Sequence, residues 1–279
     1  GFTGVCLGLS GGIDSALVAA MAADAVGGGN VYGISMPSMY SSQGSKDDAA
    51  DLAANIGAHY DVQPIKPMYD AFQQQLALDG VSAENLQARI RGVIVMAYSN
   101  SKGVLALATG NKSELACGYS TIYGDAVGGY APIKDVFKTK VWQLARWRNS
   151  AAAAGMGVGG LHVVGNEAGD AGVQLPGGVM IPVNSITKAP SAELRPGQKD
   201  SDSLPQYELL DRVLEAYIEH AHGRADLLAD GFDDETVSTV IRLVDRAEWK
   251  RRQYPLGPKV SALAFGRDRR LPVTSAFRE

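Results

Sequence analysis

The strongest constraint on the fold is the alternation of short apolar runs with segments of helical periodicity along the first 110 residues. The apolar runs predict strands near 4–9, 31–36, 59–65 and 103–109. The periodic segments predict helices over 13–26, 45–56, 68–78 and 83–99, with Gly28, Gly57 and Gly103 where helices should stop. Short strands separated by helices indicate a parallel sheet covered on both faces. We therefore expect an α/β fold with a doubly wound, Rossmann-like parallel sheet, which collects ligands at the carboxyl ends of its strands.

The pattern changes after about residue 135. A helix is expected around 138–149, followed over 155–178 by a glycine-rich stretch that we interpret as a mobile loop or insertion. C-terminal helices follow a second irregular stretch. One carries an apolar face made of Tyr207, Leu210, Leu214, Tyr217 and Ile218, and another lies near 234–250. No internal repeat is visible, and we treat 1–279 as a single domain.

Composition narrows the class of protein. The 279 residues are 46% hydrophobic, which is ample for a core, and the net charge of −4 gives no sign of a nucleic-acid footprint. Two cysteines, Cys6 and Cys117, do not make a disulfide framework or a zinc site. No apolar run approaches the length of a membrane span, so we expect a cytoplasmic protein that binds neither membranes nor nucleic acid. Because the first strand begins almost at once, we expect the chain to be part of something longer, or processed.

Residues 7–15, LGLSGGIDS, form the turn between the first strand and the first helix. A helix N-terminus offers unpaired N–H groups and a partial positive charge, and glycines allow phosphate oxygens to approach the backbone. Asp14 is unexpected beside a polyphosphate unless a cation lies between them, which predicts a magnesium ion. The stretch fits neither GxxxxGK[ST] nor GxGxxG. A tight α/β connection without a ligand is the alternative.

SGGIDS resembles the PP-loop of the N-type ATP pyrophosphatases, which split ATP into AMP and pyrophosphate while activating a carboxylate or carbonyl. Further motifs resemble the NAD synthetase family within that group: NLQARIR at 85–91, LATGNKSELACGYSTIYGD at 107–125, PIKDVFKTKV at 132–141, PSAELRPGQKDSDSLPQYELLD at 190–211 and WKRRQ at 249–253. The tail AFGRDRRLPV resembles the glutamine-dependent enzymes. The glutaminase domain that precedes the synthetase in those enzymes is not in this sequence.

The resemblance implies two steps in one site. The carboxylate of deamido-NAD attacks the α-phosphorus of ATP, and ammonia then attacks the adenylated carbonyl to release NAD and AMP. The resemblance also implies a homodimer that shares the dinucleotide pocket.

The same resemblance assigns roles to residues, with catalytic roles for Ser10, Asp14 and Lys138. The expected ATP-binding residues are Gly8, Ser10, Gly11, Gly12, Asp14, Ser15, Thr109, Lys138 and Ser191. The expected deamido-NAD-binding residues are Asn85, Arg89, Glu114, Tyr123, Asp125 and Lys250. Magnesium is expected on Asp14 and Glu114, since hard cations prefer carboxylate and phosphate oxygens. Arg91 is turned away from Asn85 and Arg89 on the helix, so a structural role is equally open.

Other interpretations remain open. Glu114 could be a surface carboxylate, Lys138 a solvated lysine like its neighbour Lys140, and Lys250 a basic helix end. The chain could be another PP-loop ligase, either similar to GMP synthetase or tRNA-modifying. A noncatalytic nucleotide sensor is the alternative from a different class, although it would have little use for Asp14, Glu114 and Lys138 together.

Overall fold

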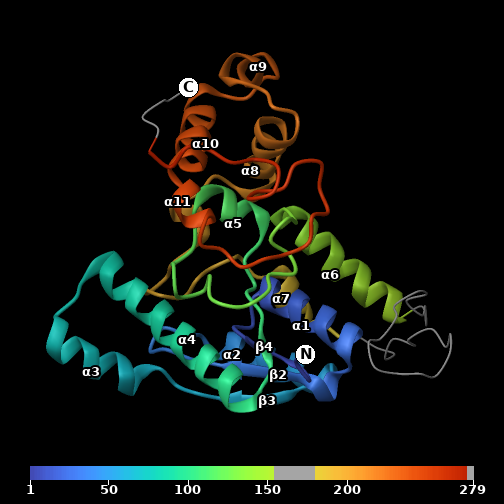
Figure 1. Cartoon of the computed structure of the whole chain (residues 1–279), viewed down its shortest axis with the longest axis vertical. Coiled ribbons are helices and arrows are strands. Elements are labelled where there is room, and N and C mark those ends of the chain that lie inside the picture. Colours follow the sequence, from blue (N-terminus) through green and yellow to red (C-terminus); the bar gives the residue numbers. More distant parts are fainter. Residues whose placement is uncertain (154–179, 275–279) are drawn as a thin grey trace.

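The computed structural model describes residues 1–153 and 180–274, and Figure 1 shows their arrangement. The glycine-rich stretch 155–178, expected to be a mobile loop or insertion, lies outside the described residues. Among the described residues, no helix combines the length and the apolar character needed to cross a membrane.

Four parallel strands form the sheet, in the order β3-β2-β1-β4. They are β1 (Val5–Gly8), β2 (Val31–Ser35), β3 (His59–Val62) and β4 (Leu105–Ala106). Val5 of β1 lies opposite Val31 on one side and Leu105 on the other. The last strand is shorter than the expected 103–109, because the backbone from Leu107 onward pairs with Tyr130 of a neighbouring loop.

Helices cover both faces of this sheet, which confirms the doubly wound fold. On one face, Leu7 of β1 packs in a core shared with α1 (Ile13–Val26) and α2 (Gln43–Asn55). On the other face, Cys6 packs with Val95 of α4 (Gly80–Lys102), which lies beside α3 (Lys66–Leu76). Neighbouring residues of β1 therefore point to opposite cores, as the period of a strand requires.

A second, helical core lies above the sheet in Figure 1. It is built from α5 (Lys112–Cys117), α8 (Tyr207–Leu214), the turn Glu215–Glu219, α9 (Arg224–Ala229) and α10 (Asp234–Arg246). The expected apolar face is confirmed, since Tyr207, Leu210, Leu214, Tyr217 and Ile218 are all buried. Trp142 of α6 (Lys138–Ala153) packs against both cores and joins them; the short α7 (Val183–Thr187) packs on the sheet side.

The expectation of one helix over 234–250 is wrong. The chain turns at Ala247, and α11 (Glu248–Arg251) follows as a separate helix. Arg251 explains the break, because its buried guanidinium donates to the carbonyl of Val244 in the last turn of α10 and to that of Ala116 in α5. The Val244 carbonyl also accepts from the Ala247 N–H at 3.2 Å, a bond to the third residue along that tightens the last turn of α10.

The strand order places the turn after β1 at the switch point of the sheet. The connection through α1 and α2 leads to β2 and β3 on one side, whereas α4 leads to β4 on the other. Ligands of open α/β sheets bind in the crevice at this point. The fold therefore places residues 8–15 where a nucleotide is expected.

One buried ion pair joins α1 to α6 and can be tested directly. Arg148 donates from Nε and Nη2 to the two carboxylate oxygens of Asp24, both at 2.7 Å. We expect Asp24→Asn to lower the free energy of unfolding by about 3 kcal/mol, since it leaves the guanidinium poorly compensated. The exposed pair Lys66–Asp70 is the control, and Asp70→Asn should cost less than about 1 kcal/mol. Urea unfolding checks both, and equal losses would contradict the assignment.

Candidate active site

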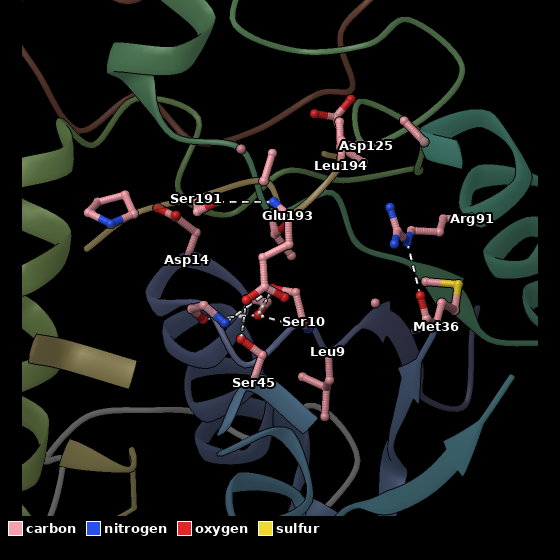
Figure 2. A pocket seen from close by; sticks show the side chains of 18 of the residues that line it. Leu9, Ser10, Asp14, Met36, Ser45, Arg91, Asp125, Ser191, Glu193 and Leu194 are labelled. Atoms are coloured by element: carbon pink, nitrogen blue, oxygen red, sulfur yellow. Dashed lines mark hydrogen bonds between the residues drawn. The ribbon is translucent and has the colours of Figure 1, made fainter. Parts of the chain in front are cut away.

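A cavity of about 310 Å³ opens at the carboxyl edge of the sheet, between the β1–α1 turn and the loop 188–194 (Figure 2). This volume is at the lower end of those of small-molecule sites. Its walls come from the β1–α1 turn, the end of β2, α4, the segments 107–110 and 119–127, and the loop 185–194. Of the expected ATP-binding residues, eight line it: Gly8, Ser10, Gly12, Asp14, Ser15, Thr109, Lys138 and Ser191. The remaining one, Gly11, does not line it.

The β1–α1 turn has the geometry of an anion cradle. Gly11 has φ of +78°, and a Cβ there would lie 2.1 Å from the carbonyl oxygen of Ser45, so only glycine fits. Gly12 is the N-cap of α1, and no side chain caps this helix. The hydroxyls of Ser10 and Ser15 lie 3.1 Å apart at the same place. Since the first turn of a helix has N–H groups without intrahelical partners, this end can bind phosphate.

Asp14, Glu114 and Lys138 meet in the cavity although they come from three different helices. Lys138, the first residue of α6, donates to Asp14 Oδ2 and lies 3.5 Å from Glu114 Oε1. Asn111 donates to Asp14 Oδ1 at 2.9 Å and, as N-cap of α5, also accepts from the backbone N–H of Glu114. The two side chains expected to bind magnesium and the lysine expected to be catalytic therefore form one cluster.

Sequence reasoning missed Asp200, which also lines this cavity. Its carboxylate accepts from Tyr207 at 2.9 Å and from Tyr119 at 3.4 Å. Burial raises the pKa of Asp200, against the opposing effect of Lys138. The signals in the sequence were the acidic run KDSDS and its place in the motif at 190–211. With Asp14 and Glu114, it brings three carboxyl groups around one ammonium.

Burial, and then repulsion from Asp14, raises the pKa of Glu114 to about 8. Burial alone would lower the pKa of Lys138, but attraction to Asp14 and Glu114 outweighs it and raises that pKa. Lys138 is therefore a fixed positive charge, whereas burial and Asp14 favour the protonated form of Glu114. The cluster carries more acidic groups than Lys138 can balance.

The donor set fits a magnesium ion that is shared with phosphate. Asp14 and Glu114 supply hard oxygen ligands beside the anion cradle, and a divalent cation would compensate the excess negative charge. Across residues 1–153 and 180–274, no three His, Cys, Asp or Glu side chains are already grouped as metal ligands. Magnesium is commonly bound by one or two carboxylates, with waters and substrate phosphates completing the octahedron, so two protein ligands suffice.

The residues expected to bind deamido-NAD gather around the segment 118–125, next to the cavity. Lys250 donates to the carbonyls of Gly118 and Ser120, both at 2.7 Å. The remaining contacts are Asn85 with the Thr121 hydroxyl, Arg89 with the Ile122 carbonyl, Tyr123 with Gln253, and Asp125 with the Thr121 N–H. Asp125 and Glu114 line the cavity itself; the other four do not.

Arg91, for which a structural role was equally open, lines the cavity. Figure 2 shows it across the cavity from Asp14, where its Nε donates to the Met36 carbonyl at 3.0 Å. Burial lowers the pKa of Arg91 to about 10, while Asp125 and Glu193 favour its charged form. Arg91 thus adds a buried positive charge on the side of the cavity away from Asp14, with Asp125 and Glu193 near it.

Glu193 was not singled out in the sequence, although it lies over the β1–α1 turn. In Figure 2 its side chain reaches down from the loop 188–194, and it accepts from the hydroxyls of Ser42 at 2.8 Å and Ser45 at 3.0 Å. Its backbone has φ of +47°, an uncommon value for a residue with a side chain. Ser191, by contrast, uses its hydroxyl within the loop, on the carbonyl of Gln198. This loop covers the cavity.

Comparison with known proteins defines the class. The sequence model of the family described as NAD synthase matches residues 1–254, so the chain belongs to the NAD synthase family. It is 48% identical over 284 residues to a glutamine-dependent NAD(+) synthetase of Acinetobacter baylyi, covering 100% of this chain and 48% of the relative. The chain thus spans about half the length of the curated relatives it matches.

Two solved structures agree with this. One is a glutamine-dependent NAD+ synthetase of Acinetobacter baumannii in complex with ADP, with 44% identity, a TM-score of 0.58, and coverage of 98% of this chain and 46% of that one. The other is an NH3-dependent NAD synthetase of Campylobacter jejuni, with 30% identity and a TM-score of 0.63. The match covers 87% of this chain and 84% of the Campylobacter jejuni chain. Its length is therefore close to that of the present chain.

The raised pKa of Glu114 predicts how stability depends on pH without divalent cations. Because the folded state binds a proton that the unfolded state releases above its ordinary pKa of 4.5, the free energy of unfolding should fall as pH rises from about 4.5 to 8. In Glu114→Gln this part of the slope should vanish. Urea unfolding of both proteins at several pH values measures the difference between their slopes. Asp125 and Asp200 are present in both proteins, so their contributions cancel in this difference. Identical slopes would contradict the assigned pKa.

Proposed function

We propose that this chain amidates deamido-NAD to NAD at the expense of ATP, which becomes AMP and pyrophosphate. The observation that carries the proposal is the meeting of Asp14, Glu114 and Lys138 beside the uncapped N-terminus of α1. Departure of pyrophosphate needs this combination of anion cradle, fixed cation and metal ligands. Family membership supports the same reaction, and the ADP complex of the Acinetobacter baumannii enzyme supports an adenine nucleotide as ligand.

In this mechanism the N–H groups of the first turn of α1 and the hydroxyls of Ser10 and Ser15 hold the phosphates of ATP. Lys138 stabilises the charge that develops on the departing pyrophosphate. Asp14 and Glu114 would hold a magnesium ion, which when bound supplies neutralisation of phosphate charge. The loop 188–194 and Tyr254 line the cavity. In this proposal they exclude water, which would otherwise hydrolyse the activated carboxylate.

The dinucleotide enters from the side of the segment 118–125 in this proposal. Arg89 and Lys250 place positive charge there, and the nicotinate carboxylate must reach the α-phosphorus inside the cavity. As the family resemblance implies, the proposal also includes a homodimer whose partner subunit completes the pocket. We also retain the expectation of a cytoplasmic protein, which its two free cysteines support.

Ammonia is the nitrogen donor that we assign to these 279 residues. Burial raises the pKa of Cys6 to about 11 and that of Cys117 to about 12, so neither thiol forms the thiolate that glutamine hydrolysis would need. The second step needs only a neutral amine, because the adenylate has already activated the carbonyl. The NH3-dependent enzyme of similar length supports this assignment.

The nitrogen source gives the first test of the function. With ATP, magnesium and deamido-NAD, we expect ammonium salts to support NAD formation and glutamine to support none. At fixed total ammonium the rate should rise with pH, since more of the donor loses its proton. NAD, AMP and pyrophosphate are measured by chromatography. Turnover with glutamine alone would contradict the donor assignment, and unchanged ATP would favour the nucleotide sensor.

The substrate test separates the other PP-loop ligases. Xanthosine monophosphate, the substrate of a GMP synthetase, and unmodified tRNA replace deamido-NAD with ammonia kept constant. Release of pyrophosphate with either, and none with deamido-NAD, would replace the proposed substrate.

Asp14 gives a test of the charge cluster. Asp14→Asn keeps the size of the side chain and can still accept from Asn111, but it weakens the hold on the cation and on Lys138. We expect a loss of about 3 to 4 kcal/mol of transition-state stabilisation, typical of one key electrostatic group. Measurement of kcat/KM for ATP gives this loss, with thermal unfolding as the control for folding. Near-normal turnover would remove Asp14 from the mechanism.

A further inference from the structure

Lys112 is a fully buried lysine that the proposed mechanism does not use. It is the first residue of α5 and does not line the cavity. Its ammonium donates to Glu219 Oε1 at 2.7 Å, to the Ser261 hydroxyl at 2.6 Å and to the Leu263 carbonyl at 2.9 Å, and it lies 3.0 Å from Asp135. A buried ammonium is costly unless it is fully hydrogen-bonded. Lys112 meets that condition by joining four separate parts of the chain.

Asp135 extends this cluster to the C-terminal segment. Its carboxylate accepts from the N–H groups of Val260 and Ser261, both at 2.8 Å, and from the Ser261 hydroxyl. The segment 260–263 is therefore fixed on α5 by a charged network rather than by apolar packing alone. Figure 1 shows this C-terminal segment running past α5 towards the start of α6.

The cluster is adjacent in the chain to the residues that carry the proposed chemistry. Lys112 stands between Asn111, which holds Asp14, and Glu114. Asp135 precedes Lys138 by three residues, and the Lys112 N–H donates to the carbonyl of Val136 at 2.9 Å. The N-terminal ends of α5 and α6 are thereby held side by side. A helix of six residues has little stability of its own, so its position depends on such contacts.

We propose that Lys112 is a positioning residue, which with Asp135 and Ser261 sets the approach of Glu114 and Lys138 to Asp14. This role rests on the proposed function. An apolar side chain of the same size would often be as good for stability, because replacing buried ions with well-packed apolar groups is commonly neutral. A hydrogen-bonded ammonium differs in fixing the relative positions of its partners. Catalytic groups need such support, because a displacement of about 1 Å can cost 100-fold in rate.

The experiment separates positioning from charge balance. Lys112→Met removes the ammonium and leaves Asp135 buried without it. The double variant Lys112→Met, Asp135→Asn removes one charge of each sign and leaves Glu219 as the remaining carboxylate, while the amide oxygen can still accept from Val260 and Ser261. Ser261→Ala keeps all three charges and removes only the bridging hydroxyl. The matched control is Lys259→Met. It breaks an ion pair in the same C-terminal segment, in which Lys259 Nζ lies 2.7 Å from Asp268 Oδ2.

Four quantities are measured for each protein: the unfolding temperature, kcat with ammonia, the magnesium concentration at half-maximal rate, and binding of magnesium–ATP by calorimetry. Lys112→Met should lower the unfolding temperature. The double variant should regain most of the lost unfolding temperature. Its kcat should nevertheless stay about 10- to 100-fold below that of the wild type, and its magnesium requirement should be raised. Ser261→Ala should show the same changes to a smaller degree, and the control should show neither.

The proposal is overturned if every folded member of the set has the wild-type kcat, magnesium requirement and magnesium–ATP affinity. Recovery of activity together with stability in the double variant would likewise show that Lys112 only balances charge. If the wild-type chain forms no NAD, the proposed function fails, but the calorimetric comparison with magnesium–ATP still tests the positioning role.

Discussion

The site depends on one electrostatic constraint: Asp14, Glu114 and Asp200 share a buried space with a single ammonium, that of Lys138. Like charges in a poorly solvated space repel, so the arrangement is stable only if a proton or another cation joins it. The raised pKa of Glu114 is a consequence of its burial and of this repulsion. Bringing such groups together opposes folding, and the surrounding structure must hold them in place.

Two cores provide that restraint from opposite sides. The sheet core fixes the start of α1, and with it Asp14, because β1 lies centrally between β2 and β4. The helical core holds α5 and α8, and with them Glu114. Lys138 begins α6, whose Trp142 packs against both cores. The cluster forms where the two meet, so a disturbance of either core would alter its geometry.

Sequence reasoning was accurate where local chemistry decides the outcome. The spacing of apolar residues predicted α1 over 13–26, and the glycines with Asp14 predicted an anion cradle, because periodicity and backbone freedom are properties of adjacent residues. The break at Ala247 was missed, since it depends on Arg251 reaching carbonyls of both α10 and α5. Asp200, Glu193 and the buried Lys112 were missed for the same reason: their surroundings are assembled from segments distant in the sequence.

Under the proposed function, the acidic cluster must accommodate an anionic substrate. Phosphates placed at the N-terminus of α1 approach Asp14 and Glu114, and their charge would be repelled unless cations lie between them. Magnesium bound to ATP would compensate the negative charge of the carboxylates and of the phosphates together, whereas ATP without magnesium would compensate neither. Arg91 lies across the cavity from Asp14 and donates to the Met36 carbonyl, with Asp125 and Glu193 favouring its charged form. Under the proposed function, the phosphates would therefore lie beside Asp14 and Glu114 only when the metal accompanies them.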